Sequence, residues 1–402
     1  MVMTTVKNEL STFDPVPFEE LVKLPILIVD DVHLLRQLLL NFLEKEGFEN
    51  IHIAVDGRDA LKKIEEVQPA LVILDILMPE MDGFEVCQTL RRNSKYDNIP
   101  IIIQTGMEET GERLRIFKEG ANDLLLKPVN GAELVARVKV HLQNSLLQGR
   151  MREYQERTSK ELEAALQIQA ALMPDMSKIK RMKEETGLTL GALFSPSSEL
   201  SGDFWGAEIL EDGSLAIYSV DFTGHGVASA LNTFRLHSFL SDGNWDWKNP
   251  SEWLQKLNKR LCKVLNVGQF ATLFYAVIDP DNKTLKYASA GAPPVVYKAS
   301  KNHDAELLET AGLPIGIMAS TDYPTSEFSF EKGAELIIYS DAFIETSSAN
   351  EDVLGEEDLC RLISEIQSIQ SGSEKIDHLM KVFPGRHLER LPDDLTLITV
   401  SN

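Results

Sequence analysis

Basic residues, cysteines and long apolar runs are all scarce in this sequence. The 40 lysines and arginines face 62 aspartates and glutamates, so the formal net charge is −22. Nucleic-acid binding requires a basic face, and no basic cluster is visible, so we expect no nucleic-acid partner. The three cysteines, Cys87, Cys262 and Cys360, have neither disulfide nor metal spacing, which is typical of a reducing compartment.

Signals for membrane insertion and export are lacking as well. No apolar run approaches the ~20 residues that cross a bilayer. Residues 1–24 contain no basic region followed by an apolar one, which argues against a signal peptide. We therefore predict a cytoplasmic protein with no membrane partner.

The chain has enough apolar residues and enough length for more than one folded domain. Hydrophobic residues make up 43% of the 402 residues, and no internal repeat or low-complexity tract is evident. After an N-terminal tail over 1–24, residues 25–145 alternate short apolar runs with amphipathic stretches. Apolar runs that indicate strands cover 26–29, 51–54, 71–74, 101–104 and 124–126. Five strands that are each followed by a helix predict a multidomain chain that begins with a doubly wound, flavodoxin-like α/β domain with a parallel sheet.

Residues 146–173 read as a helical linker. Their apolar positions recur every three or four residues through a stretch rich in Glu, Gln, Lys and Arg, until Pro174 ends the pattern. These positions are Met151, Tyr154, Thr158, Leu162, Leu166, Gln169 and Leu172. The stripe is thin, so two alternatives stay open: a partly exposed helix, or a two-stranded coiled coil that forms a homodimer.

Residues 174–402 predict an α+β domain, in which sheets are flanked by helices. Runs that indicate strands cover 188–194, 215–220, 271–279, 285–290, 335–340 and 395–400. Two helices interrupt them, one over 227–240 and one that opens at Asn249-Pro250. Clustered strands with segregated helices are typical of this fold class.

Polar residues gather at the carboxyl ends of the strands in the first domain. They are Asp30 and Asp31 after the first strand, Asp75 after the third, Thr105 after the fourth and Lys127 after the fifth. Ligands of such sheets bind at this edge. Three converging carboxylates would repel one another without a cation, and oxygen ligands suit Mg²⁺. A helix N-cap explains any one of these aspartates, but not the whole set.

This arrangement resembles the receiver domain of two-component response regulators. The resemblance implies that Asp75 accepts a phosphoryl group from a histidine kinase or phosphotransfer protein. Asp30, Asp31, Asp75 and the carbonyl of Leu77 would hold Mg²⁺, while Thr105 and Lys127 would contact the phosphoryl group. The family also implies a cis bond between Lys127 and Pro128. Leu124 departs from the family, which usually has an aromatic residue there.

Carboxylates also end the apolar strands of the second domain. Asp203, Asp221, Asp341 and the pair Asp393-Asp394 occupy such positions. Buried charges of one sign are costly, so groups of this kind commonly share cations. Two metals close together activate water and clamp a phosphate.

The order of these motifs resembles the PPM family of metal-dependent serine/threonine phosphatases, in its SpoIIE and RsbU branch. The resemblance extends from the residues Ala165 to Gln169 and Leu172-Met173-Pro174 to the end of the chain. It implies two Mn²⁺ or Mg²⁺ ions that share Asp221. Asp203 and the carbonyl of Phe222 would complete one ion, and Asp341 and Asp393 the other, with Asp394 as an alternative to Asp393.

Four further positions qualify this resemblance. His225 lies between two glycines and could act as a general acid or cap a helix, and the residues alone do not decide between these roles. Gly206, Ala292 and Ala342 stand where the family tends to have Asp, His and Gly respectively.

The resulting hypothesis is a receiver that controls a PPM phosphatase through a helical linker. Family resemblance implies a phosphorylated anti-sigma-factor antagonist of the STAS type as the substrate, in a partner-switching pathway. The alternative is a phosphatase-like adaptor that binds a sigma-factor regulator without hydrolysis. A DNA-binding regulator is disfavoured, because the chain is acidic and has no basic recognition helix.

Overall fold

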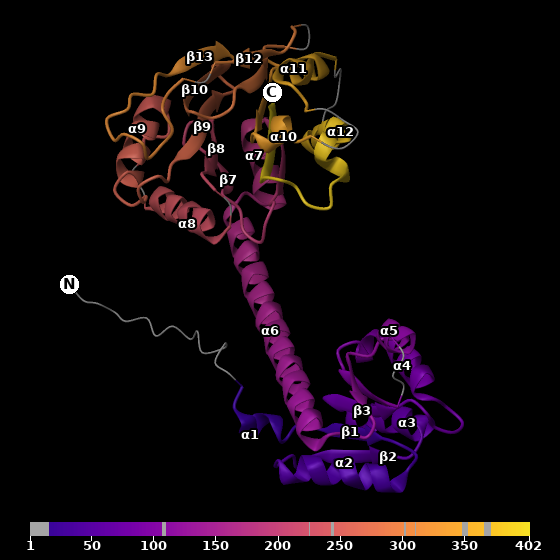
Figure 1. The fold of residues 1–402 in the computed structure, drawn as a ribbon. Helices are drawn as coiled ribbons and strands as arrows, with labels where there is room; N and C mark the ends of the chain where they lie inside the picture. Colours follow the sequence, from indigo (N-terminus) through magenta and orange to yellow (C-terminus); the bar gives the residue numbers. More distant parts are fainter. Residues whose placement is uncertain are drawn as a thin grey trace, which may run out of the picture. The chain divides into compact units, whose positions relative to one another are not determined.

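The chain forms two compact units, Met1–Arg157 and Thr158–Asn402, and helix α6 (Gly131–Leu172) contributes residues to both (Figure 1). The computed structural model describes residues 16–106, 110–224, 226–242, 245–300, 303–309, 311–347, 353–365 and 371–402. Within these ranges, every helix is too short or too polar to cross a bilayer.

The N-terminal unit is a five-stranded parallel sheet in the order β2-β1-β3-β4-β5, with helices on both faces. The strands are β1 (Ile26–Val29), β2 (Ile51–Ala54), β3 (Leu71–Asp75), β4 (Ile101–Thr105) and β5 (Asp123–Leu126). The helices before α6 are α1 (Phe18–Leu21), α2 (His33–Lys45), α3 (Gly57–Val67), α4 (Gly83–Arg91), the short 3₁₀ helix η2 (Ser94–Tyr96) and α5 (Thr110–Lys118). The predicted doubly wound fold is confirmed.

Apolar residues on successive strand positions fill a separate core on each face of this sheet. Leu27, Val72 and Ile103 belong to one core, whereas their neighbours Ile28 and Ile73 belong to the other. All residues of β1, β3 and β4 are buried, as expected for a parallel sheet that is covered on both sides. This burial explains why the apolar runs in the sequence are continuous instead of alternating.

The C-terminal unit contains two five-stranded sheets, in the orders β13-β10-β9-β8-β7 and β12-β11-β14-β15-β6. Their strands are β6 (Thr189–Ser195), β7 (Asp203–Ile209), β8 (Leu215–Phe222), β9 (Ala271–Asp279), β10 (Thr284–Ala290), β11 (Val295–Lys298), β12 (Glu306–Leu308), β13 (Ser326–Ser329), β14 (Glu335–Tyr339) and β15 (Leu395–Ser401). All pairs of these strands are antiparallel. The predicted α+β class is therefore confirmed.

Helices flank both sheets of this unit. They are α7 (Met176–Thr186), α8 (Val227–Ser241), α9 (Pro250–Leu261), α10 (Ala342–Glu345), α11 (Glu356–Glu365), α12 (Gly372–Val382) and the 3₁₀ helix η3 (Pro384–His387). In β14, Leu336 and Ile338 join the large core that contains both sheets, while Ile337 and Tyr339 join the core under α10, α11 and α12. The C-terminal end of β14 and the start of β15 lie beside the start of β7 and the end of β8.

Candidate functional site

The carboxylates of Asp30, Asp31 and Asp75 meet at the carboxyl edge of the N-terminal sheet. In the described part of the chain, they form the only group of three potential metal ligands whose oxygens all lie within 4.8 Å of one another. Asp30 and Asp75 are buried, whereas Asp31 is exposed. Three oxygen ligands at this spacing, with one side open to solvent, fit a hard divalent cation such as Mg²⁺.

Lys127 supplies a positive charge to this group from the end of β5. Its Nζ lies 2.7 Å from Asp75 Oδ2 and 3.3 Å from Asp30 Oδ2. Burial raises the pKa of Asp30, although the backbone N–H of Val32 and the charge of Lys127 oppose the shift. The lysine therefore offsets part of the cost of keeping two buried carboxylates side by side.

The remaining predicted residues of this site lie around the same edge. Thr105 is buried at the end of β4, and its carbonyl accepts a hydrogen bond from the Lys127 N–H at 2.8 Å. The Lys127–Pro128 bond is cis, as expected. Leu77, expected to contribute its carbonyl, follows β3 with an exposed side chain. A Cβ at Gly83 would collide with the carbonyl oxygen of Asp75, so this position lets α4 begin directly beneath the end of β3.

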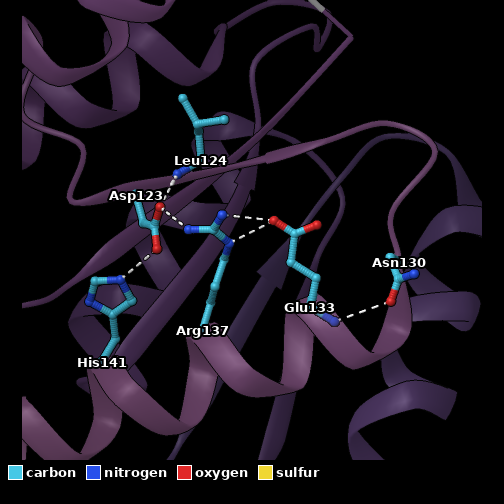
Figure 2. Close-up of polar contacts among 6 residues, drawn as sticks. All are labelled: Asp123, Leu124, Asn130, Glu133, Arg137 and His141. Atoms are coloured by element: carbon cyan, nitrogen blue, oxygen red, sulfur yellow. Dashed lines mark hydrogen bonds and ion pairs between the residues drawn. The ribbon is translucent and has the colours of Figure 1, made fainter.

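A polar network joins the start of β5 to the first turns of α6 (Figure 2). Arg137 Nη1 donates to Asp123 Oδ1 at 2.6 Å, and His141 Nε2 lies 3.0 Å from Asp123 Oδ2. Arg137 also donates from Nε and Nη2 to Glu133 Oε1. Leu124, the residue that departs from the family pattern, donates its N–H to Asp123. The strand that carries Lys127 at its far end is thus fastened to the helix that continues into the C-terminal unit.

The C-terminal unit has an acidic cleft between the ends of its two sheets. The cleft has a volume of about 250 Å³, and its acidic lining residues are Asp203, Asp221, Asp341, Glu345 and Glu356. Among the residues that the structure describes, no lysine, arginine or histidine lines it. A lining with five acidic residues and no basic one favours bound cations, because cations balance the charge.

The electrostatics of this cleft follow from burial and mutual repulsion. Burial, followed by the charges of Asp341, Asp393 and Asp394, raises the pKa of Asp221 to about 7. Burial and the charge of Asp221 also raise the pKa of Asp203 well above its ordinary value. The pKa of Asp341 is raised by burial and by Asp393. Each ionised form is unfavourable without a counter-charge.

Neighbouring strands bring Asp203 and Asp221 together. The two residues are paired across β7 and β8, and Thr396 Oγ1 donates to Asp203 Oδ2 at 2.6 Å. Gly202 is required for this approach, since a Cβ there would lie 2.7 Å from the carbonyl oxygen of Phe222. The predicted carbonyl ligand at Phe222 therefore lies beside the loop that precedes Asp203.

Asp393 and Asp394 have different surroundings. Both oxygens of Asp394 accept hydrogen bonds: Oδ1 from the N–H and hydroxyl of Ser197, and Oδ2 from the N–H of Gly202. Asp393 is exposed, and its Oδ1 accepts the N–H of Asp394. Asp394 thus holds two loops together, whereas Asp393 accepts one hydrogen bond and is not among the residues that line the cleft.

The end of α6 contacts the same loop through a residue that the site prediction omits. Gln169 is fully buried, and its Nε2 donates to the Ser201 carbonyl and to Thr233 Oγ1, each at 2.8 Å. Its Oε1 accepts the Ser201 N–H at 3.2 Å. Ser201 Oγ in turn accepts the N–H of Asp203 at 3.0 Å. One glutamine therefore links the linker helix, the loop before Asp203 and helix α8 after Asp221.

The structure also accounts for the departures from the family pattern. A Cβ at Gly206 would collide with the hydroxyl of Tyr218, so an aspartate there would require the Tyr218 side chain to move. Ala342 begins α10 and is absent from the positive-φ residues in the described ranges, so it needs no glycine conformation. Ala292 lines the cleft. His225 lies outside the described residues, and both roles proposed for it stay open.

Comparisons with known proteins match the N-terminal and C-terminal parts of the chain to different families. The model for the response regulator receiver domain matches residues 26–139, and the model for stage II sporulation protein E (SpoIIE) matches residues 211–402. The signal receiver domain of a signal transduction histidine kinase from Syntrophus aciditrophicus is 32% identical, with 30% of this chain and 91% of that chain covered and a TM-score of 0.29. Residues 26–139 therefore match the response regulator receiver domain, and residues 211–402 match the SpoIIE domain, which is of the PPM phosphatase type.

Two further relatives each match more than half of this chain. Phosphoserine phosphatase RsbU of Bacillus subtilis (strain 168) is 28% identical over 250 residues, which cover 62% of this chain and 72% of RsbU. The SiaA-PP2C domain of Pseudomonas aeruginosa shares the fold, with a TM-score of 0.53 and 19% identity over 62% of this chain and 98% of that one. Curated relatives that match the receiver domain alone are covered by this chain over 48 or 49% of their own length.

Sequence reasoning missed three side chains at the phosphatase cleft. Glu345 and Glu356 line it, and Gln169 holds the adjacent loop. Neither glutamate ends an apolar strand, so the signal that identified the aspartates does not apply to them. Gln169 lies in the otherwise mainly apolar stripe of the linker. A polar residue at such a position indicates a buried side chain that forms hydrogen bonds.

Proposed function

We propose that this protein is a response regulator in which phosphorylation of Asp75 controls a metal-dependent protein phosphatase that acts on phosphoserine or phosphothreonine. The observation that carries the proposal is the cleft with five carboxylates and, among the described residues, no cation. A binding adaptor has no need of such a cleft, since these carboxylates repel one another. In this proposal, two metal ions balance the negative charge of these carboxylates.

The four predicted aspartate ligands have distinct roles in this scheme. Mn²⁺ or Mg²⁺, when bound, would supply acidified water and neutralise the phosphate. Asp221 would bind both ions, and a bound cation would favour its ionised form, which burial and the neighbouring carboxylates disfavour in the absence of metal. Thr396 donates to one oxygen of Asp203, which would leave the other oxygen to hold an ion. Asp341 and Asp393 would hold the second ion.

The receiver site supports phosphorylation by the same kind of argument. Asp75 ends β3 beside Asp30 and Asp31, and Lys127 Nζ lies 2.7 Å from its carboxylate. With Mg²⁺ bound by the three aspartates, Asp75 would attack the phosphoryl group and Lys127 and Thr105 would contact its oxygens. A histidine kinase or a phosphotransfer protein is the proposed donor.

Helix α6 is the proposed route of control. Its first turns carry Arg137, which bonds Asp123, and its last turn carries Gln169, which bonds the loop before Asp203. Rotation or translation of this helix would therefore change the hydrogen bonds between Gln169 and Ser201. Ser201 lies two residues before Asp203, a proposed metal ligand. A phosphoryl group shifts a two-state element only through such differential contacts.

The middle of α6 also supports association of two copies. All residues from Met151 to Arg157 are exposed, including the apolar side chains of Met151 and Tyr154. A helix that buries no face within its own chain is stabilised when it packs against a partner helix. We propose a homodimer through the linker, which sedimentation of the full chain can test.

The proposed substrate is a phosphorylated anti-sigma-factor antagonist of the STAS type. The support is the similarity to the phosphoserine phosphatase RsbU, together with the family resemblance of the sequence motifs. Partner switching, in which dephosphorylation changes the protein that the antagonist binds, is the corresponding pathway class.

A phosphate-release assay tests the function. Purified full-length protein is incubated with Mn²⁺ and either p-nitrophenyl phosphate or a serine-phosphorylated STAS protein, with and without acetyl phosphate as a receiver phosphodonor. We expect metal-dependent release that acetyl phosphate changes in rate. Absence of release in both receiver states would favour the adaptor instead.

Gln169→Leu tests the route of control in the same assay. The substitution removes both donated hydrogen bonds but keeps a side chain of similar length. We expect phosphate release to stop responding to acetyl phosphate, while Asp75 is still phosphorylated. Gln167→Leu is the matched control, because Gln167 is exposed on the same helix. An unchanged response in Gln169→Leu would contradict coupling through this residue.

A further inference from the structure

Exposed apolar side chains of the phosphatase domain gather on three segments of the chain. We define the apolar rim as Val227, Leu231, Val267, Leu313, Ile317 and Met318. Their exposed fractions range from 45% for Leu313 to 107% for Val267. Single exposed apolar residues are ordinary on protein surfaces, but a contiguous group of them marks an interaction site.

Hydrogen bonds hold the three segments together. Asn258 is fully buried on α9; its Nδ2 donates to the Met318 carbonyl at 2.8 Å, and its Oδ1 accepts the Gly316 N–H at 2.9 Å. Arg235 of α8 donates to the Val264 carbonyl at 3.3 Å. Ala271 and Ile315 exchange two backbone hydrogen bonds of 2.9 and 2.8 Å. The rim is therefore a preformed surface.

The apolar rim adjoins the acidic cleft. Helix α8, which carries Val227 and Leu231, starts shortly after Asp221, and Thr223 bonds the carbonyl of Phe270 just beyond Val267. On the opposite wall, Gly291 lines the cleft, and a Cβ built on it would lie 2.8 Å from the Pro314 ring. A molecule whose phosphate entered the cleft would thus meet the rim.

The segments that form the rim are free of acidic residues. Residues 226–235, 262–270 and 311–321 contain no Asp or Glu, although the whole chain has 62. Their charged residues are Arg235 and Lys263, both cationic and exposed. The rim would therefore attract, or at least not repel, a partner that carries a phosphate, in contrast to the strongly acidic remainder of the chain.

We propose that the apolar rim is the docking surface for the folded phosphoprotein substrate, which it recognises through an apolar patch next to the phosphorylated residue. This inference rests on the proposed phosphatase function. Continuity with the cleft and the absence of acidic residues both favour this occupant. A small phosphate ester reaches the cleft without contacting the rim, so the two kinds of substrate should respond differently to changes there.

The test replaces Val267 and Ile317 together by aspartate in the full chain. Its substrates are a serine-phosphorylated STAS protein, the phosphoserine peptide cut from that protein, and p-nitrophenyl phosphate. We expect kcat/KM for the folded phosphoprotein to fall at least 10-fold, mainly through KM. Hydrolysis of p-nitrophenyl phosphate should stay within 2-fold of wild type, and the peptide should resemble the ester.

Controls separate docking from general damage. Met176→Asp introduces the same charge at an exposed apolar residue on α7, away from the rim, and should leave all three substrates unaffected. The conservative pair Val267→Ile and Ile317→Val should retain the phosphoprotein activity. Equal losses for the ester and the phosphoprotein, or no loss for either, would overturn the proposal.

Binding measurements keep this inference separate from the proposed activity. Titration calorimetry with the serine-phosphorylated STAS protein uses Asp221→Asn, with and without the two rim substitutions, so that no turnover occurs. Weaker binding of the rim variant supports docking even if wild-type protein hydrolyses nothing, an outcome that would refute only the phosphatase. Equal affinities would overturn the rim proposal. The rim proposal would also be overturned if wild type sedimented as a dimer and the rim variant as a monomer. The rim would then bind a second copy of this chain and not the substrate.

Discussion

The receiver and phosphatase domains both gather carboxylates at strand ends, but they balance the negative charge differently. In the receiver, Lys127 lies within 3.3 Å of two of the three aspartates. The phosphatase cleft is lined by five acidic residues, with no lysine or arginine among the described lining residues. The receiver site therefore carries part of its counter-charge in its own chain, whereas the described lining of the phosphatase cleft carries none.

Because the two sites balance their charge differently, we expect them to depend on bound cations to different degrees. A site with an internal lysine is assembled before its ion arrives, which suits a switch that must wait for a phosphoryl group. A site without one has carboxylates with raised pKa values, including a value of about 7 at Asp221, and gains the most from binding cations. Substitutions that alter the charge balance of one domain should leave the other domain unchanged.

The largest effect is expected from Asp221→Asn in the phosphatase cleft. It removes a charge proposed to be shared by both ions, so phosphate release should fall by about 10³-fold or more, comparable with chelation by EDTA. Phosphate release from p-nitrophenyl phosphate with Mn²⁺ measures it. Receiver phosphorylation by acetyl phosphate should be unchanged. Asp281→Asn, at an exposed turn of the same domain, is the matched control; full activity in Asp221→Asn would refute the shared ligand.

Lys127→Met would make the receiver site resemble the phosphatase cleft. Removing the cation leaves the carboxylates of Asp30 and Asp75 together without compensation, which should cost about 2–3 kcal/mol of receiver stability in EDTA, a value reduced for the partial exposure of Lys127. Millimolar Mg²⁺ should restore much of the loss. Chemical denaturation followed by circular dichroism measures this, with Lys118→Met as an exposed control. A loss that Mg²⁺ leaves unchanged would show that the lysine acts in another way.

Asp393→Asn and Asp394→Asn should separate metal binding from loop attachment within the phosphatase cleft. Asp394 accepts three hydrogen bonds from Ser197 and Gly202, so its substitution should destabilise the domain by about 2 kcal/mol. Asp393→Asn should leave the midpoint of unfolding in EDTA unchanged and raise the Mn²⁺ concentration needed for half-maximal activity. The reverse pattern would assign Asp394 as the ligand.

The smallest effect concerns Asp123, at the network between β5 and α6. Burial raises its pKa, but hydrogen bonds from Arg137, His141 and the Leu124 N–H outweigh burial, so the pKa lies below its ordinary value of 3.8. The ionised form is therefore stabilised in the folded state, and this contribution is present above pH 3.8 and lost as the pH falls below it. Asp123→Asn should lower receiver stability by about 1 kcal/mol at pH 7.

Titration of the same variant provides the check on that sign. The stability difference between wild type and Asp123→Asn should shrink as the pH is lowered from 5 to 3, because wild-type Asp123 then becomes protonated. Asp97→Asn, at an exposed receiver position, should show no such trend. A difference that is constant with pH would indicate that the carboxylate charge is not involved.

The elements that the sequence predicts are those whose pattern depends on local burial alone. The five continuous apolar runs of the receiver match β1 to β5 within one residue at each end. Strand β7, in contrast, contains Gly206, and β12 and β13 are short and partly exposed edge strands, so no apolar run marks them. Helices α11 and α12 also escaped prediction, because their single buried faces only become evident against the second sheet.

For the sites, residue type and strand-end position were sufficient to identify the aspartates, because a buried carboxylate at the end of an apolar strand is too costly to occur without a purpose. Distances between chain-remote groups were decided only by the tertiary structure. It distinguished the fully bonded Asp394 from Asp393, added Glu345 and Glu356 to the cleft, and placed Gln169 against the loop before Asp203. Adjacent aspartates share one sequence pattern, and their separate roles arise because Ser197 and Gly202, nearly two hundred residues earlier in the chain, reach one of them and not the other.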